Sequence, residues 1–310
     1  MKDKLTFSSL LLLALFSALA PALASTTWYV SGANGNDANN CLSPTTACKT
    51  IGHAISLAAS GDSIMVAAAT YRGNLTISKS LNIIGSSAQT TIIDGGGHNT
   101  VVTISNSAAR VTLSHLTIRH GNAPTGGGIY NSGALTINNC VISGNSANAN
   151  PGGPPQGGGI YSAGTLTINN STIQGNSALG ALFGGQGGGI YTTAILTINN
   201  SAITGNNSTV NSYPHQGAAG GGIYTRATLT INNSTISGNT AEAPPGRASA
   251  RVIAFILQGA AASQGATQQS TTPLSAEIAQ TTRAAASMAA RLSRTALSRT
   301  ITVEETALAR

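Results

Sequence analysis

The stretch Gly126-Gly-Gly-Ile-Tyr130, with Leu135-Thr-Ile-Asn-Asn-Cys-Val-Ile-Ser-Gly-Asn145 after it, decides the fold because the chain repeats it. The unit is 20 residues long, and its four copies occupy 126–145, 157–176, 187–206 and 220–239. Successive copies begin 31, 30 and 33 residues apart, and all the difference in length lies between the end of one copy and the Gly-Gly-Gly of the next. Internal repetition at such a period indicates stacked repeats that bury their apolar sides against one another.

Each copy alternates apolar and polar residues as a β-strand does. Leu135 and Ile137 point to one side and Thr136 to the other, while Ile129 and Ile142 supply inward residues on two further short strands. Three short strands cannot bury their apolar side alone, but coils stacked about 4.7–4.9 Å apart form a continuous core. Glycines and Asn pairs suit left-handed or crowded corners, and stacked Asn side chains can bond between coils as a ladder.

A less regular alternation of apolar and polar residues precedes the four regular copies. It occurs at 63–66, 75–77, 81–84, 91–93, 101–104, 111–113 and 116–118. Before these segments, apolar residues at 51, 54, 55 and 58 have a helical spacing, so 50–59 is expected to form a short helix over the open strand edges of the first coil. The predicted organisation is a cap at 25–61 and one solenoid of coils at 62–241.

The chain resembles the right-handed parallel β-helices of the pectate-lyase-like superfamily, and its repeats are similar to those of bacterial polymorphic outer-membrane-type proteins. The likeness rests on Gly-Gly-Gly-Ile-Tyr and on Ile142-Ser-Gly-Asn145, where that group carries Gly-Gly-Ala-Ile-like and Phe-x-x-Asn motifs. Trp28-Tyr-Val30, the paired cysteines and 50–59 also resemble the amino-terminal cap of secreted β-helix proteins. The resemblance covers roughly 26–241 and implies an all-β, right-handed parallel β-helix solenoid with a short N-terminal capping helix.

The first 24 residues have the pattern of a secretory signal. Lys2 and Lys4 precede an apolar run at 10–20, and Ala22-Leu-Ala24 forms a small-x-small cleavage site. The alternative is a membrane anchor, but the run is short for a span and ends at Pro21. We therefore expect a protein at the cell surface or outside the cell, with no transmembrane segment after signal removal.

Composition excludes other classes. Only 7% of residues are charged, and the few basic residues behind the net charge of +7 form no patch, so no nucleic-acid binding is expected. The shortage of Glu and Lys excludes a coiled coil or a helical bundle.

Export makes a disulfide between Cys41 and Cys48 feasible, because the polar loop between them contains Pro44 and can bring the sulfurs together. Metal binding is the rival interpretation, although two cysteines without neighbouring His or Asp make half a site. Cys140 stands where the other copies have Ser171, Ser201 and Ser234, so it is interpreted as a small side chain tolerated at a repeat position.

Catalytic chemistry has few candidates. A lyase on this fold would need acidic residues for calcium and a basic side chain, and a hydrolase would need two carboxylates in one groove. Residues 25–241 contain three Asp and no Glu, and the four regular copies contain no carboxylate. Asp94 or His98 could line a groove with residues one coil later, namely His115, Arg119 and His120. The alternative is that all of them are solvated turn residues. No cofactor or metal is expected.

Two surfaces are candidates for binding. The repeat places four tyrosines above one another, Tyr130, Tyr161, Tyr191 and Tyr224. This row could hold sugar rings or a partner, or it could simply pack between coils. The loops 146–156, 177–186 and 207–219 enter between the same two strands, so they should share one edge, and they carry Phe183, Tyr213 and His215. Insertions in stacked repeats cluster on one, often binding, face.

The tail at 242–310 breaks the pattern. Shifting the codons of 268–280 by one nucleotide permits Thr-Ile-Asn-Asn-Ser-Thr-Ile-Ser-Gly-Asn-Ser-Ala, the repeat consensus. The hypothesis is that the tail contains further coils read out of frame. The alternative is a genuine helix at 276–297 packed on the last coil.

The expected function is that of a secreted or cell-surface, non-catalytic β-helix acting in adhesion or in contact with a carbohydrate or a surface protein. The alternative is a polysaccharide lyase or glycoside hydrolase with its site in the early coils.

Overall fold

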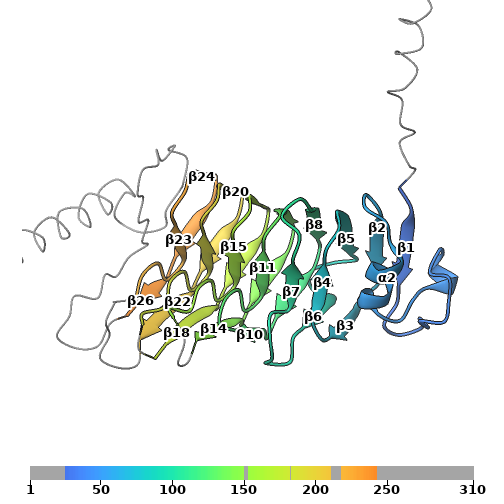
Figure 1. Cartoon of the computed structure of the whole chain (residues 1–310), viewed down its shortest axis with the longest axis horizontal. Helices are drawn as coiled ribbons and strands as arrows, with labels where there is room; N and C mark the ends of the chain where they lie inside the picture. Colours follow the sequence, from blue (N-terminus) through green and yellow to red (C-terminus); the bar gives the residue numbers. More distant parts are fainter. Residues whose placement is uncertain (1–24, 150–152, 182, 211–217, 243–310) are drawn as a thin grey trace, which may run out of the picture.

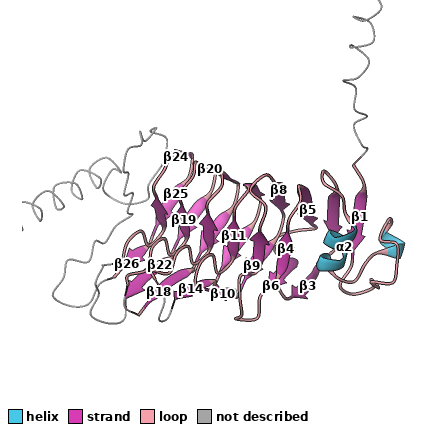
Figure 2. Ribbon diagram, viewed as in Figure 1, coloured by secondary structure: helices cyan, strands magenta, loops and turns pink. Residues whose placement is uncertain are grey.

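The computed structural model describes residues 25–149, 153–181, 183–210 and 218–242. Over this range the chain winds into a right-handed parallel β-helix, seen lengthwise in Figure 1, whose strands pair in parallel from coil to coil. Figure 2 shows that strands make up nearly all the regular structure of the described residues and that helix lies at the amino-terminal end. The predicted fold class is confirmed. The predicted signal peptide at 1–24 and the tail from 243 onward lie outside the described residues.

Four parallel sheets, named A to D here, form the sides of the solenoid. Sheet A contains β1 (Thr27–Val30), β2 (Ser63–Val66), β5 (Leu81–Gly85), β8 (Arg110–Ser114), β12 (Ala134–Asn138), β16 (Leu166–Asn169), β20 (Leu196–Asn199) and β24 (Leu229–Asn232). Sheet B contains β3 (Ala69–Arg72), β6 (Thr91–Asp94), β9 (Thr117–Arg119), β13 (Val141–Ser143), β17 (Thr172–Gln174), β21 (Ala202–Thr204) and β25 (Thr235–Ser237). Sheet C contains β4 (Leu75–Ile77), β7 (Val102–Ile104), β11 (Ile129–Asn131), β15 (Ile160–Ser162), β19 (Ile190–Thr192) and β23 (Ile223–Thr225). Sheet D contains β10 (Asn122–Ala123), β14 (Ser146–Ala149), β18 (Ser177–Gly180), β22 (Asn207–Val210) and β26 (Thr240–Ala241).

The prediction of three strands per coil is wrong, because the strands of sheet D add a fourth. The chain passes from sheet A to B, then D, then C, so each regular coil has four strands, and the first residues of the predicted loops are strands of sheet D. Their inward positions hold small residues, for example Ala147, Ala178 and Ser208, each with 0% of its surface exposed. Small side chains give no strong hydrophobic alternation, so only pairing with the neighbouring coil makes these segments strands.

The core follows the predicted inward positions. Ile129, Leu135, Ile137 and Ile142 are buried in the first regular coil, and their equivalents are buried in the other three. One hydrophobic cluster runs from Val30 in the first strand to the last regular coil. The column of Ile and Leu therefore holds the solenoid together along its whole described length.

Glycine and asparagine shape the corners. Gly126 has a φ of 61° and Asn139 a φ of 53°, and their equivalents in the later copies share this left-handed backbone. A Cβ on Gly127 would lie 2.2 Å from the carbonyl oxygen of Ser146, so the second glycine of the triplet is needed for space. The predicted Asn ladder is present: the side chains of Asn145, Asn176, Asn206 and Asn239 hydrogen-bond from coil to coil.

Helix α2 (Ile51–Leu57) covers the first coil and packs on β1, β2 and β4 with Ile51, Ala54 and Ile55 buried. It is shorter than the predicted 50–59 because Thr50 caps its start, accepting from the N–H of His53, and Ala58 has extended backbone. Nearby lies the short 3-10 helix η1 (Pro44–Thr46). Among the residues that the structure describes, no helix has the length and apolar character to cross a membrane.

The predicted disulfide joins Cys41 and Cys48, whose Cα atoms are 5.0 Å apart, and it closes the loop around η1. Cys140 is buried without a disulfide partner, and burial raises the pKa of its thiol to about 11. Its backbone N–H donates to the hydroxyl of Ser171 in the next coil, and Ser171 and Ser201 continue this series. A small side chain at this corner is therefore part of a second ladder between coils.

Candidate functional site

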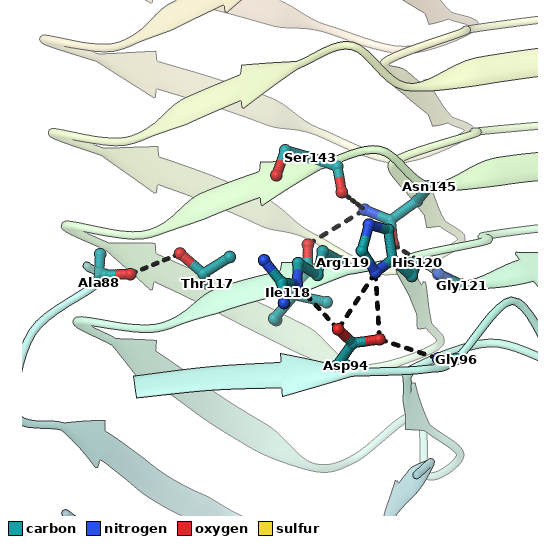
Figure 3. A network of polar contacts seen from close by, with 10 residues as sticks. All are labelled: Ala88, Asp94, Gly96, Thr117, Ile118, Arg119, His120, Gly121, Ser143 and Asn145. Carbon is teal, nitrogen blue, oxygen red and sulfur yellow. Dashed lines mark hydrogen bonds and ion pairs between the residues drawn. The ribbon is translucent and has the colours of Figure 1, made fainter. Parts of the chain in front are cut away.

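Sheet register brings three of the predicted early-coil residues together. Asp94 ends β6 and Arg119 ends β9, and the two residues are paired neighbours in sheet B. Arg119 Nε donates to Asp94 Oδ2 at 2.9 Å, and His120 Nδ1 lies 3.1 Å from Oδ2 and 3.2 Å from Oδ1 (Figure 3). His120 reaches the carboxylate because it follows β9 in a left-handed turn, with a φ of 56°.

Both oxygens of the Asp94 carboxylate accept hydrogen bonds within the fold. Burial by itself raises its pKa, but hydrogen bonds from the Gly96 N–H, Arg119 and His120, together with the charge of His120, hold the pKa below the ordinary 3.8. The carboxyl group is thus ionised at neutral pH and bound from several sides. Such a group holds two coils together and is a poor general base, because its oxygens are already occupied and a lowered pKa disfavours proton uptake.

His115 and His98 do not join this cluster. His115 stands at the corner between β8 and β9 with a φ of 57°, the position that Asn139 takes in the next coil, and its side chain is exposed. His98 is exposed between β6 and β7, where its carbonyl accepts from the side chain of Asn74. The grouping of Asp94 with Arg119 and His120 therefore leaves out both of these histidines.

The other two aspartates of the coil region also have structural partners. Asp37 accepts from the N–H groups of Lys49 and Thr50 and from the hydroxyl of Thr50, next to the start of α2. Asp62 accepts from the indole N–H of Trp28 and from the N–H groups of Thr26 and Ala59. Burial opposes ionisation at both sites, but these hydrogen bonds lower both pKa values. Asp62 therefore fastens the cap to the residues just before β2, whereas Asp37 fastens the cap loop to the start of α2 within the cap.

The tyrosine row forms a continuous stack on the outer face of sheet C. Ring centroids are 5.0 Å apart between Tyr130 and Tyr161, 5.3 Å between Tyr161 and Tyr191, and 5.2 Å between Tyr191 and Tyr224. The rings are within 10° of parallel, and the guanidinium of Arg226 lies 5.7 Å from the Tyr224 centroid. Ring faces inside the row contact one another, so a ligand can reach only ring edges and hydroxyl groups there. Tyr130 and Tyr161 are half-exposed, while Tyr191 and Tyr224 are buried.

The described connections from sheet D to sheet C form the second candidate surface, called the loop edge and comprising 153–156, 181, 183–186 and 218–219. Beside it is a hollow of about 410 Å³, lined among others by Pro124, Asn148, Pro154 and Gln156. Its lining is uncharged and mixes amide groups with proline rings. The structure thus offers a concave polar surface where the repeats vary in length.

Gln156 and Gln186 link this edge to the tyrosine row. Gln156 Nε2 donates to Gln186 Oε1 at 3.1 Å, and the Gln156 side chain also bonds Tyr191. The sequence interpretation did not single out these glutamines, although each stands directly before a Gly-Gly-Gly. Phe183 is half-buried on the loop edge, while Tyr213 and His215 lie outside the described residues.

One group of side chains in the described residues has the spacing of a metal site. Cys41, Cys48 and His53 place their potential ligand atoms within 4.8 Å of one another. The two sulfurs are bonded to each other, and a metal needs thiolates. The arrangement therefore fits a disulfide with a histidine beside it.

Comparison with known proteins gives one family match. Residues 170–193 match the Chlamydia polymorphic membrane protein repeat. This segment runs from the Asn corner of one copy through Gly-Gly-Gly-Ile-Tyr of the next, the motifs on which the resemblance rested. A search of curated proteins finds no matching relative.

Solved structures similar to the chain include pectin methylesterases. The enzyme from carrot is 13% identical, with a TM-score of 0.44 over 72% of this chain and 78% of its own. The enzyme from Erwinia chrysanthemi is 15% identical, with a TM-score of 0.37 over 70% of this chain and 81% of its own. The enzyme from Aspergillus niger is 14% identical, with a TM-score of 0.39 over 80% of this chain and 87% of its own. Sequence identities and TM-scores this low carry no information about the activity of this chain.

Proposed function

We propose that the protein is a secreted or cell-surface, non-catalytic β-helix that binds a glycan or a surface protein through the loop edge. One observation carries the proposal: Asp37, Asp62 and Asp94 each hold parts of the fold together through several hydrogen bonds. Acid–base chemistry on sugars requires carboxyl groups free to exchange protons beside the substrate. The aspartates of the coils are committed elsewhere, so binding is the function that these coils support best.

The loop edge has the chemistry of a carbohydrate-binding surface. Amide groups of Asn148 and Gln156 can both donate and accept hydrogen bonds, as sugar hydroxyls do. The hollow between them is lined partly by proline, and the half-exposed Tyr161 stands in the neighbouring sheet. Neutral hydrogen-bonding groups beside apolar rings suit neutral sugar units, so a glycan is the favoured ligand and a surface protein the second outcome.

Two observations support a location outside the cytoplasm. The disulfide between Cys41 and Cys48 is of the kind that persists in oxidising compartments. The matched repeat belongs to a family described as a membrane protein. Both agree with the signal peptide expected at 1–24.

The test uses a natural short connection as its template. In the β10 coil Pro124 alone separates Ala123 from Thr125, whose counterparts in the next coil are Ala147 and Gln156. A three-loop variant replaces 148–155, 179–185 and 209–218 each with a single proline. We expect it to keep the circular dichroism of a β-helix and to lose binding to an immobilised panel of oligosaccharides, or to cell-surface proteins, that the natural chain binds.

A matched control alters a different side of the solenoid. Changing Thr136, Thr167 and Thr197 to Val keeps their shape and removes three hydroxyls from the outer face of sheet A. This variant should bind as the natural chain does. If it loses binding while the three-loop variant retains it, the loop edge is the wrong surface.

The second candidate is a polysaccharide-degrading enzyme, and the observation in its favour is the meeting of Asp94, Arg119 and His120 on one surface. The assay measures release of uronides or reducing sugars from a polysaccharide panel, with and without calcium. We expect no turnover by the natural chain. Turnover abolished by Asp94→Ala but retained by Ser143→Ala, one coil further along sheet B, would establish the enzyme and refute the non-catalytic proposal.

A further inference from the structure

A second cavity lies at the other end of the solenoid, where the cap meets the first coil. Its volume is about 310 Å³, and it is bounded by Lys49 and Thr50 before α2 and by 70–75 around the turn from β3 to β4. This cap cavity shares no lining residue with the hollow beside the loop edge. It is large enough for a small ion or for one charged substituent of a larger ligand.

Two exposed basic residues, Lys49 and Arg72, are among those that line the cavity, and neither makes an ion pair within the described residues. Arg72 is the sheet neighbour of Asp94, but the Asp94 carboxylate is bonded to Arg119 and His120 on its other side. Lys49 lies beside Asp37, whose oxygens accept instead from backbone N–H groups and from the Thr50 hydroxyl. Both cationic groups are therefore free to bind an added anion.

Tyr71 and Asn74, two other polar residues of the lining, already make hydrogen bonds within the fold. The Tyr71 hydroxyl donates to the carbonyl of Ala67 and accepts from the N–H of Gly32. The Asn74 amide donates to the carbonyls of His98 and Thr100. The lining contains no carboxylate, so the charged residues that line the cavity are all basic.

We propose that the cap cavity binds an oxyanion, with Lys49 and Arg72 as its two cationic ligands. A guanidinium can donate two parallel hydrogen bonds to a carboxylate, sulfate or phosphate, and an ammonium group adds a second positive charge. The anion bridges the cap loop and the first coil, which are otherwise joined by the contacts of Asp62 and α2. The site is independent of ligand binding at the loop edge.

The test is calorimetric titration of the full, oxidised protein with sodium phosphate, sodium sulfate or sodium glucuronate, at constant ionic strength set by sodium chloride. The natural chain should bind at least one of the three, and the one bound most tightly identifies the source of the oxyanion. The double variant Lys49→Gln/Arg72→Gln should bind about tenfold more weakly or not at all, as expected for loss of charge-assisted hydrogen bonds.

Arg110→Gln is the matched control, because it removes one exposed positive charge from sheet A, away from the cavity. It should bind with unchanged affinity. Arg72→Lys should retain part of the affinity, because charge remains while the paired hydrogen bonds are lost. The proposal fails if no anion produces heat beyond dilution, or if Arg110→Gln weakens binding as much as the double variant does.

Discussion

The side-chain amide of Asn176 donates to Oδ1 of Asn206 at 3.0 Å, and the same Oδ1 accepts the backbone N–H of Asn176. Asn176 in turn accepts both corresponding hydrogens from Asn145. Each asparagine thus lies at the corner before sheet D in its own coil. Its hydrogen bonds to the equivalent asparagine of the neighbouring coil fix the spacing between the two coils. A second Asn ladder, which includes Asn169, runs along the edge of sheet A nearer to solvent.

We expect Asn176→Ala to lower the free energy of unfolding by about 1–3 kcal/mol, because it leaves buried donors of Asn145 without an acceptor. Asn169→Ala should cost less than about 1 kcal/mol, because water can replace its half-exposed partners. Urea denaturation measures both. Equal losses of unfolding free energy for the two variants would mean that burial does not determine how much each ladder contributes to stability.

Asp94 should make stability depend on pH. Its pKa is lower in the folded chain than the ordinary 3.8, so its contribution is complete above about pH 4–5 and disappears as pH falls through the folded pKa. Asp94→Asn should therefore lose roughly 1–2 kcal/mol at pH 7, and the loss should shrink as the pH falls below 4. A double-mutant cycle with Arg119→Gln isolates the pair. A loss that stays constant from pH 7 to pH 2 would contradict this account.

Tyr161 and Tyr191, the two inner members of the tyrosine row, should titrate late. Burial raises the pKa values of Tyr161 and Tyr191, and neighbouring tyrosines raise them further, while Arg226 lowers both. The folded state therefore keeps protons that the unfolded state has lost, and stability should fall as pH rises above 10. Absorbance titration of tyrosinate should show Arg226→Gln shifting the late transitions upward. An unchanged or lowered transition would contradict a lowering effect of Arg226 on Tyr161 and Tyr191.

The tail offers a genetic prediction. In the described residues β23, β24, β25 and β26 are the last strands of their sheets, so no described strand pairs with the far edge of the coil that ends at Ala241. We expect the gene to contain a single-base shift near codons 242–258 that restores the repeat frame. Correcting it should add coils and raise the melting temperature. If no such shift opens a repeat frame in the gene sequence, residues 243–310 are a genuine tail.

Much of the fold could be predicted from local pattern. Alternation of large apolar residues with Thr and Asn identified most strands of sheets A, B and C, because a strand with one buried face needs that period whatever lies beside it. It missed β3 (Ala69–Arg72), which has one buried residue, Tyr71. The Gly-Gly-Gly and Asn-Asn corners were predictable for a similar reason, since few residues adopt left-handed backbone. Helix α2 was visible from its spacing of apolar residues.

Tertiary structure decided the rest. Sheet D was predicted as loop, because Ser146-Ala-Asn-Ala149 becomes a strand only through pairing with β10 and β18. Asp94 and Arg119 stand 25 residues apart, and only the length of the intervening coil makes them neighbours, whereas His115, four residues from Arg119, is turned away by a corner. Stacking of the tyrosines followed from the repeat, but their burial depends on the surrounding chain. Local sequence therefore determined which face of each strand is apolar, and the winding of the solenoid determined which distant side chains meet, because contacts between coils depend on how many residues each turn consumes.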